Sequence, residues 1–108
     1  MSRAASPPPA GPARRAWLED VLRLAFAPVH LVVEDESAQH KGHAGAAGGG
    51  GHYRALIVAD AFRDQSRVAR QRAVYSALGT AMHTAIHALA LRTLTPEEWA
   101  AESARAGS

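Results

Sequence analysis

Histidine is the residue type that sets this chain apart. The 108 residues include six histidines and no cysteine. Imidazole is therefore the main soft-to-borderline metal ligand available, and the chain has no thiolates of its own to hold an iron–sulfur cluster. His87 lies in an apolar stretch, whereas His40, His43 and His52 fall in or beside a glycine-rich stretch. These four are candidate metal ligands. A partly buried strand histidine hydrogen-bonded to a neighbour remains an open interpretation for His87, and solvated loop histidines remain one for the other three.

Arginines offer a second kind of chemistry. Twelve basic residues against ten acidic ones give a net charge of +2, a bias too weak by itself to argue for nucleic acid. Several arginines gather on one predicted helix, and a guanidinium is well suited to contact phosphate. Asp60 and Asp64 dilute this group, so an ordinary solvated helix face stays an open alternative. The candidate phosphate-binding residues are Arg63, Arg67, Arg70 and Arg72.

Familiar catalytic motifs are missing from the sequence. It contains no nucleophile elbow, phosphate-binding glycine loop or paired-carboxylate site. Ser37 is too close in sequence to Glu36 and His40 to form a triad, so we expect its hydroxyl to stabilise the loop. Zinc between His83 and His87 is disfavoured because the glutamate of the zincin motif is absent. We therefore predict a protein that is not an enzyme.

Hydrophobic periodicity predicts the elements that must position these residues. Apolar residues at helical spacing predict a helix at residues 14–26, which Pro28 ends. Short β-branched runs predict strands at 31–33 and 53–59, joined by a glycine-rich loop at 36–52. Ser66 can cap a further helix, which Gly79 can divide in two. The apolar side of that helix is predicted to carry Val68, Val74, Tyr75, Leu78 and Met82.

The last third of the chain combines an ambiguous segment with a clear one. Beyond Met82, alanine and leucine favour a helix, while His87, Leu89 and Leu91 alternate as they would in a strand. Residues 95–98 read Thr-Pro-Glu-Glu, which gives a threonine cap, a proline at the first helical position and a glutamate that completes a capping box. A short final helix that carries Trp99 is predicted to begin there.

Four ordered segments resemble the BolA family. They are Asp-Glu-Ser-x-x-His at 35–40, Arg-Gln-Arg-Ala-Val-Tyr at 70–75, Ile-His-Ala-Leu-Ala-Leu at 86–91 and Thr-Pro-Glu-Glu-Trp at 95–99. Gln71 departs from the family, which usually has histidine there, so this position is not a ligand candidate. The resemblance favours a strand at 86–91. It implies an α/β fold in which a small three-stranded mixed sheet packs with helices, related to the class II KH fold. Strands one and two should pair antiparallel, and strand three should lie parallel to strand two.

The resemblance also implies a function. Proteins similar to this one share a 2Fe–2S cluster with a monothiol glutaredoxin, which supplies a cysteine and a glutathione thiolate. On that basis His87 is the first cluster ligand, and the second is expected from His40, then His43, then His52. Replacing thiolate by neutral imidazole raises the cluster potential and makes the ligation sensitive to pH. We therefore expect an adaptor for iron–sulfur trafficking or iron sensing, with no cofactor when the chain is alone.

A DNA-binding transcriptional regulator, acting through the arginine-bearing helix, is the alternative function.

The domain is expected to span residues 14–100, between a disordered tail at 1–13 and a C-terminal tail at 101–108. A targeting segment is an alternative for the N-terminus. No apolar run approaches the roughly 18 residues of a membrane span. We expect a soluble protein of the bacterial cytoplasm, or alternatively of the mitochondrial matrix, that is a monomer or weak homodimer when alone.

Overall fold

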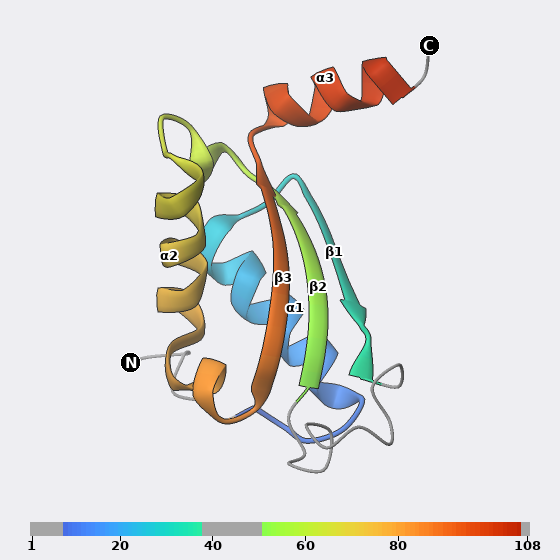
Figure 1. Ribbon diagram of the computed structural model, residues 1–108, viewed down its shortest axis with the longest axis vertical. Helices are drawn as coiled ribbons and strands as arrows, with labels where there is room; N and C mark the ends of the chain where they lie inside the picture. The colour runs from blue at the N-terminus through green and yellow to red at the C-terminus, as the bar shows by residue number, and fades with distance from the viewer. Residues whose placement is uncertain (1–7, 38–50, 107–108) are drawn as a thin grey trace.

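Helices and strands follow one another in the predicted order. The computed structural model describes residues 8–37 and 51–106, apart from the side chain of His83. The α/β prediction is confirmed, and the second half of the divided helix is a 3₁₀ turn. No helix within the described residues is both long and apolar enough to cross a membrane. The elements are α1 (Ala13–Phe26), β1 (His30–Asp35), β2 (Gly51–Val58), η4 (Asp60–Phe62), α2 (Arg67–Leu78), η5 (Gly79–His83), β3 (Ile86–Leu94) and α3 (Pro96–Ala106) (Figure 1).

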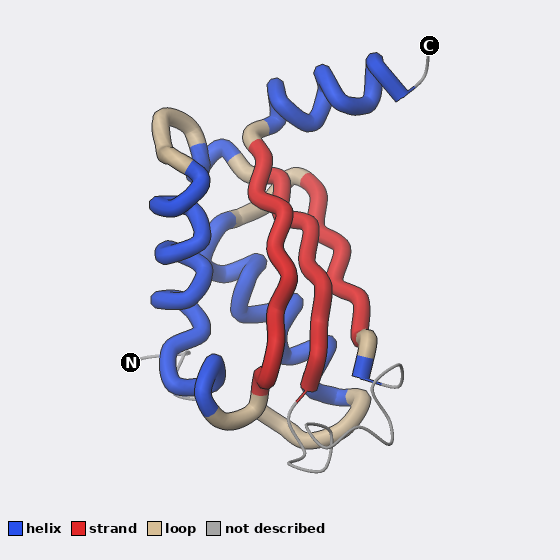
Figure 2. The backbone as a smooth tube through the Cα atoms, in the orientation of Figure 1, coloured by secondary structure: helices blue, strands red, loops and turns tan. Residues whose placement is uncertain are grey.

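The strands form one mixed sheet with the order β1-β2-β3. β1 pairs antiparallel with β2, and β2 pairs parallel with β3, as predicted. The chain leaves β2 at one end of the sheet, and α2 carries it back to the other end before β3 begins (Figure 2). The beginnings of β2 and β3 therefore lie at one end of the sheet, together with the end of β1. The ends of β2 and β3 lie at the opposite end.

Two helices cover one face of this sheet. Leu18 and Leu22 from α1 and Val74 from α2 are fully buried against the strands. Burial alternates along β1, where Val33 is 5% exposed and its neighbour Val32 is 39% exposed, as expected for a sheet that packs on one side only. The sheet thus has a covered face and a more open face, and α3 extends beyond its end rather than joining the helical layer (Figure 1).

Local signals in the sequence explain where the helices begin and end. The Ser66 hydroxyl accepts a hydrogen bond from the Ala69 amide at 3.0 Å, which caps α2. Gly79 ends α2 with a φ of +58°, a left-handed value that glycine adopts readily. At α3 the predicted capping box is present: the Thr95 amide donates to Glu98 at 2.8 Å, and the Glu98 amide donates to the Thr95 hydroxyl at 3.2 Å.

The buried side of α2 differs from the prediction. Val74 and Leu78 are buried as expected, but Val68 and Tyr75 are 57% and 41% exposed. Arg70 is buried instead, because it precedes Val74 by four residues and so lies on the same stripe of the helix.

The C-terminal boundary of the domain also differs from the prediction. The helix α3 continues to Ala106, six residues beyond the predicted limit at residue 100. Within this extension Glu102 binds Arg92 of β3 at 2.6 Å. The segment from 101 to 106 is therefore part of the folded domain rather than a tail.

Candidate metal centre and basic surface

His87 lies at an irregularity in the pairing of β2 and β3. Ile86 pairs with Gly51, but the next residue of β2, His52, pairs with Ala88, so β3 contains one extra residue at this point. Such a bulge redirects side chains locally and is frequent beside functional sites. Ile86 is buried and Leu89 packs against the core, whereas His87 is exposed. His87 is therefore accessible, as a ligand role requires, and the alternative of a partly buried histidine does not fit.

His52 is the histidine that the structure places beside His87. The centroids of the two rings are 5.6 Å apart, and the ring planes meet at 68° in an edge-to-face arrangement. His52 is half-buried, and its Nε2 atom is shielded from solvent. Of the three histidines predicted as second ligand, His52 ranked last. Its position next to the strand end was the signal that could have raised its rank.

The backbone around His52 is fixed from both sides. The Ser37 hydroxyl accepts a hydrogen bond from the His52 amide at 3.1 Å, and the His52 carbonyl accepts one from the Glu36 amide at 2.7 Å. On the other side, the Gly51 amide donates to the carbonyl of Ala85 at 2.9 Å. Ser37 thus has the loop-stabilising role predicted for it, and hydrogen bonds hold the backbone on both sides of His52.

A buried tyrosine lies on the covered face at the same end of the sheet. Tyr53 is 3% exposed, and burial raises its pKa, with a further contribution from the charge of Asp35. A Cβ atom at Gly51 would overlap the ring of Tyr53. Glycine is therefore required at the first position of β2, immediately before His52.

The remaining predicted ligands cannot be placed. His40 and His43 lie in residues 38–50, outside the described residues. Among residues 8–37 and 51–106, no three histidine or carboxylate side chains come close enough to hold a metal ion together. The described part of the candidate metal centre therefore consists of His87 and His52.

Arg70, a predicted phosphate ligand, is occupied inside the protein. It is 7% exposed, and its guanidinium donates to both carboxylate oxygens of Glu98 at 2.7 and 3.2 Å. It also donates to the carbonyl groups of Thr93 and Gln65. The hydrogen bonds from Arg70, together with that from the Thr95 amide, lower the pKa of Glu98 to about 2. Because of this burial and pairing, Arg70 does not belong to an open basic surface, which corrects the prediction for this residue.

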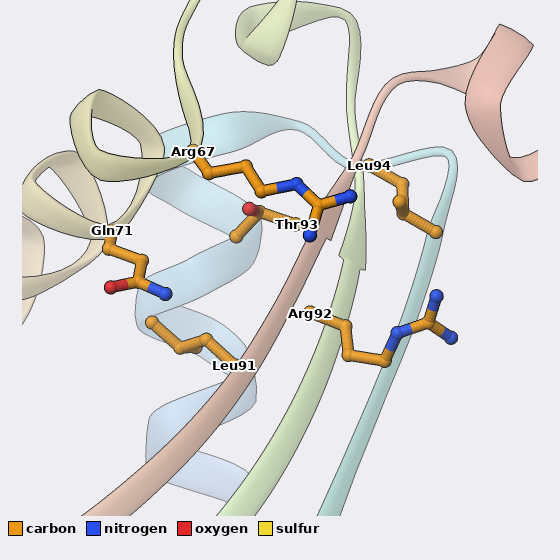
Figure 3. A pocket seen from close by; sticks show the side chains of 6 residues that line it. All are labelled: Arg67, Gln71, Leu91, Arg92, Thr93 and Leu94. Atoms are coloured by element: carbon orange, nitrogen blue, oxygen red, sulfur yellow. The ribbon is translucent and has the colours of Figure 1, made fainter.

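The other three predicted arginines are exposed. Arg63 binds Asp60 at 2.8 Å and also pairs with Glu97, and this pairing raises the pKa of Arg63 and lowers that of Glu97. Arg67 and Arg72 form no ion pair with any residue that the structure describes. Arg67 lines a hollow between α2 and β3, shown in Figure 3, with Gln71, Leu91, Arg92, Thr93 and Leu94.

Comparison with known proteins identifies the family and the fold. A family model described as BolA-like protein matches residues 22–98. The chain belongs to the BolA family. Its relatives include the DNA-binding transcriptional regulator BolA of Escherichia coli strain K12, which is 41% identical over 85 residues, covering 79% of this chain and 78% of the relative. The recognised resemblance is thereby confirmed.

Solved structures of BolA proteins have the same architecture. The BolA domain of SufE1 from Arabidopsis thaliana superposes with a TM-score of 0.72 at 37% identity, covering 82% of this chain and 99% of that domain. BolA1 from Mus musculus gives a TM-score of 0.71 at 31% identity, covering 95% of this chain and 81% of the mouse protein. The BolA fold therefore holds over nearly all of the domain described above.

Proposed function

We propose that this BolA-family protein is a non-catalytic adaptor that binds a monothiol glutaredoxin and shares a 2Fe–2S cluster with it, for iron–sulfur trafficking or iron sensing. The observation that carries the proposal is the exposed imidazole of His87, held in a bulge and in ring contact with a second imidazole, that of His52. His52 lies at the beginning of β2 and His87 at the beginning of β3, where the two strands are hydrogen-bonded to each other.

The donor set fits a cluster that is held mostly by another polypeptide. The chain has no cysteine, so the thiolates must come from the glutaredoxin and its glutathione. A cluster with imidazole and thiolate ligands has a higher reduction potential than one with thiolates alone. His87 would supply one nitrogen, and its ring must be unprotonated to bind. The bulge and the Gly51–Ala85 hydrogen bond hold the strand backbone that presents it.

A reconstituted heterodimer tests the role of His87. The protein and a monothiol glutaredoxin are combined with iron, sulfide and glutathione under anaerobic conditions, and the visible circular dichroism and cluster lifetime are measured. We expect His87→Ala to abolish the heterodimer signature. His30→Ala is the matched control, because it removes an imidazole at the opposite end of the sheet, and it should leave the spectrum unchanged. An unchanged spectrum in His87→Ala would refute the assignment.

The second ligand is decided by the same assay. His40, His43 and His52 are replaced by alanine one at a time, and the second ligand is the residue whose loss matches that of His87→Ala. His52 is the candidate with a described position beside His87. If it only orients the ring of His87, the His52→Ala cluster should form with the same spectrum and decay faster.

The second candidate function is DNA binding. It is favoured by the exposure of Arg67 and Arg72 without ion pairs among the described residues and by the name of the Escherichia coli relative. Phosphate contacts make affinity fall with salt, by a slope of about 0.9 per contact in logarithmic units. Charge reversal of Arg67 and Arg72 should weaken binding and flatten this slope. The matched control is charge reversal of Arg15 and Arg23 on α1, and equal losses in both variants would remove α2 as the DNA-binding element.

A further inference from the structure

The carboxylates of α3 are paired with arginines from three separate elements. Glu97 binds Arg63 in the segment after η4, and Glu98 binds Arg70 of α2. The third pair joins Glu102 to Arg92 of β3 at 2.6 Å. All three acidic side chains of this helix are therefore committed to basic partners outside it.

Charge, rather than apolar burial, holds α3 in place. No residue of α3 is buried. The ring of Trp99 also contacts the sheet, stacked on His30 with 5.0 Å between centroids. The two exposed pairs, those of Glu97 and Glu102, contribute little net stability, because water already solvates the separated charges. The third joins Glu98 to the buried Arg70. The helix contributes no residue to the hydrophobic core, so its displacement would break these contacts without removing any member of the core.

A further arginine lies next to these pairs. Arg67 lines the hollow between α2 and β3, which has a volume of about 100 Å³ and also includes Arg92 and the polar side chains of Gln71 and Thr93 (Figure 3). Its positive charge contributes to the low pKa of Glu98, so Arg67 lies close enough to influence the acidic side of α3. An anion entering this hollow would meet Arg67, which has no ion pair among the described residues, and Arg92, which is paired with Glu102.

We propose that α3 is an acidic cover that neutralises Arg63, Arg70 and Arg92, which together with the neighbouring Arg67 form a masked arginine surface, and that the phosphates of duplex DNA displace this cover. The inference rests on the second candidate function and adds its regulation. A row of phosphates can pair with these arginines in place of the three carboxylates, because a polyanion supplies several negative charges at once. Arg70 stays fixed by the carbonyls of Thr93 and Gln65 when its carboxylate partner leaves.

Neutralising the exposed part of the cover tests this proposal. Glu97→Gln/Glu102→Gln removes two pairs, while the pair of Glu98 with the buried Arg70 and the capping box remain. The matched control, Glu19→Gln/Asp20→Asn on α1, changes the net charge equally and also breaks an exposed ion pair, that of Arg15 with Glu19. Affinity for a short labelled DNA duplex is measured by fluorescence anisotropy across a salt series with the full-length chain.

We expect the cover variant to bind at least about tenfold more tightly, with a salt slope steeper by about two contacts, and the control variant to bind like the parent. Equal gains in both variants would overturn the cover and leave only a general charge effect. Equal affinity in parent and cover variant would also overturn it, while DNA binding would stand. If none of the three proteins binds, the cover and the DNA-binding function both fail.

Trp99 provides a second measurement that does not depend on the glutamate variants. In a Trp17→Phe background, Trp99 is the only tryptophan, and its emission reports the stacking on His30. Addition of DNA should change this emission as α3 leaves the sheet end. DNA binding without any change in Trp99 emission would overturn the displacement of the cover.

Discussion

At the scale of single residues, Ser37 connects the end of β1 to the candidate metal centre. Its side chain accepts the hydrogen bond from the His52 amide, and its own amide donates to Asp35 at 2.9 Å. The Asp-Glu-Ser motif, which helped to identify the family from sequence, therefore has a structural task. It holds the backbone of the histidine that contacts His87.

Loss of the Ser37 hydroxyl should loosen this end of the sheet. We predict that Ser37→Ala lowers the free energy of unfolding by about 0.5–1.5 kcal/mol, the usual contribution of one hydrogen bond. It should also accelerate hydrogen exchange of the His52 amide. Ser37→Thr is the control, because it keeps the hydroxyl and should stay close to the parent. Equal protection of that amide in the alanine and threonine variants would contradict the role of Ser37.

At the scale of elements, local sequence signals predicted where the helices begin, but they did not predict contacts between residues far apart in the sequence. The caps at Ser66 and Thr95 were predictable because their spacing involves neighbouring residues only. The burial of Arg70 was missed because its partner, Glu98, lies 28 positions away. Its spacing of four from Val74 was the available sign. The contact of His52 with His87 likewise depends on strand register, which a single sequence does not reveal.

The pairing of Arg70 with Glu98 should make the docking of α3 sensitive to acid. The folded state lowers the pKa of Glu98 from 4.5 to about 2. The stabilisation is therefore fully present above pH 4.5 and is lost as the pH falls through about 2. We predict that the parent exceeds Glu98→Gln in unfolding free energy by about 1 kcal/mol near neutral pH, since water screens the half-exposed carboxylate. Urea unfolding across this pH range measures the difference, and a difference that does not change with pH would contradict the pairing.

At the scale of the whole molecule, the two candidate functions use opposite ends of one sheet. His52 and His87 lie where β2 and β3 begin, while α3 and the masked arginine surface lie where β3 ends. The rise of about 3.3 Å per strand residue separates them by roughly 20 Å. The histidine pair and the masked arginine surface therefore share no residue.

This separation predicts that the two activities are energetically independent. Changes more than about 10 Å apart without shared contacts usually add within about 0.5 kcal/mol. The double variant His87→Ala/Arg67→Glu should therefore lose cluster binding as His87→Ala does and DNA affinity as Arg67→Glu does. A double-mutant cycle on both measurements checks this. A coupling energy well above that limit would show that the sheet transmits information between its ends.

The extra residue in β3 changes which side chains of this strand face the core. Ile86 and Leu89 are three positions apart, an odd spacing, yet both contribute to the hydrophobic core. Regular strand alternation would send them to opposite sides, and the irregular pairing around His87 corrects this mismatch. Deleting one residue between Ile86 and Leu89 would restore regular strand alternation. β3 would then have no extra residue to carry an outward imidazole. The outward imidazole of His87 and the packing of both Ile86 and Leu89 on the core thus have the same cause, the extra residue in β3.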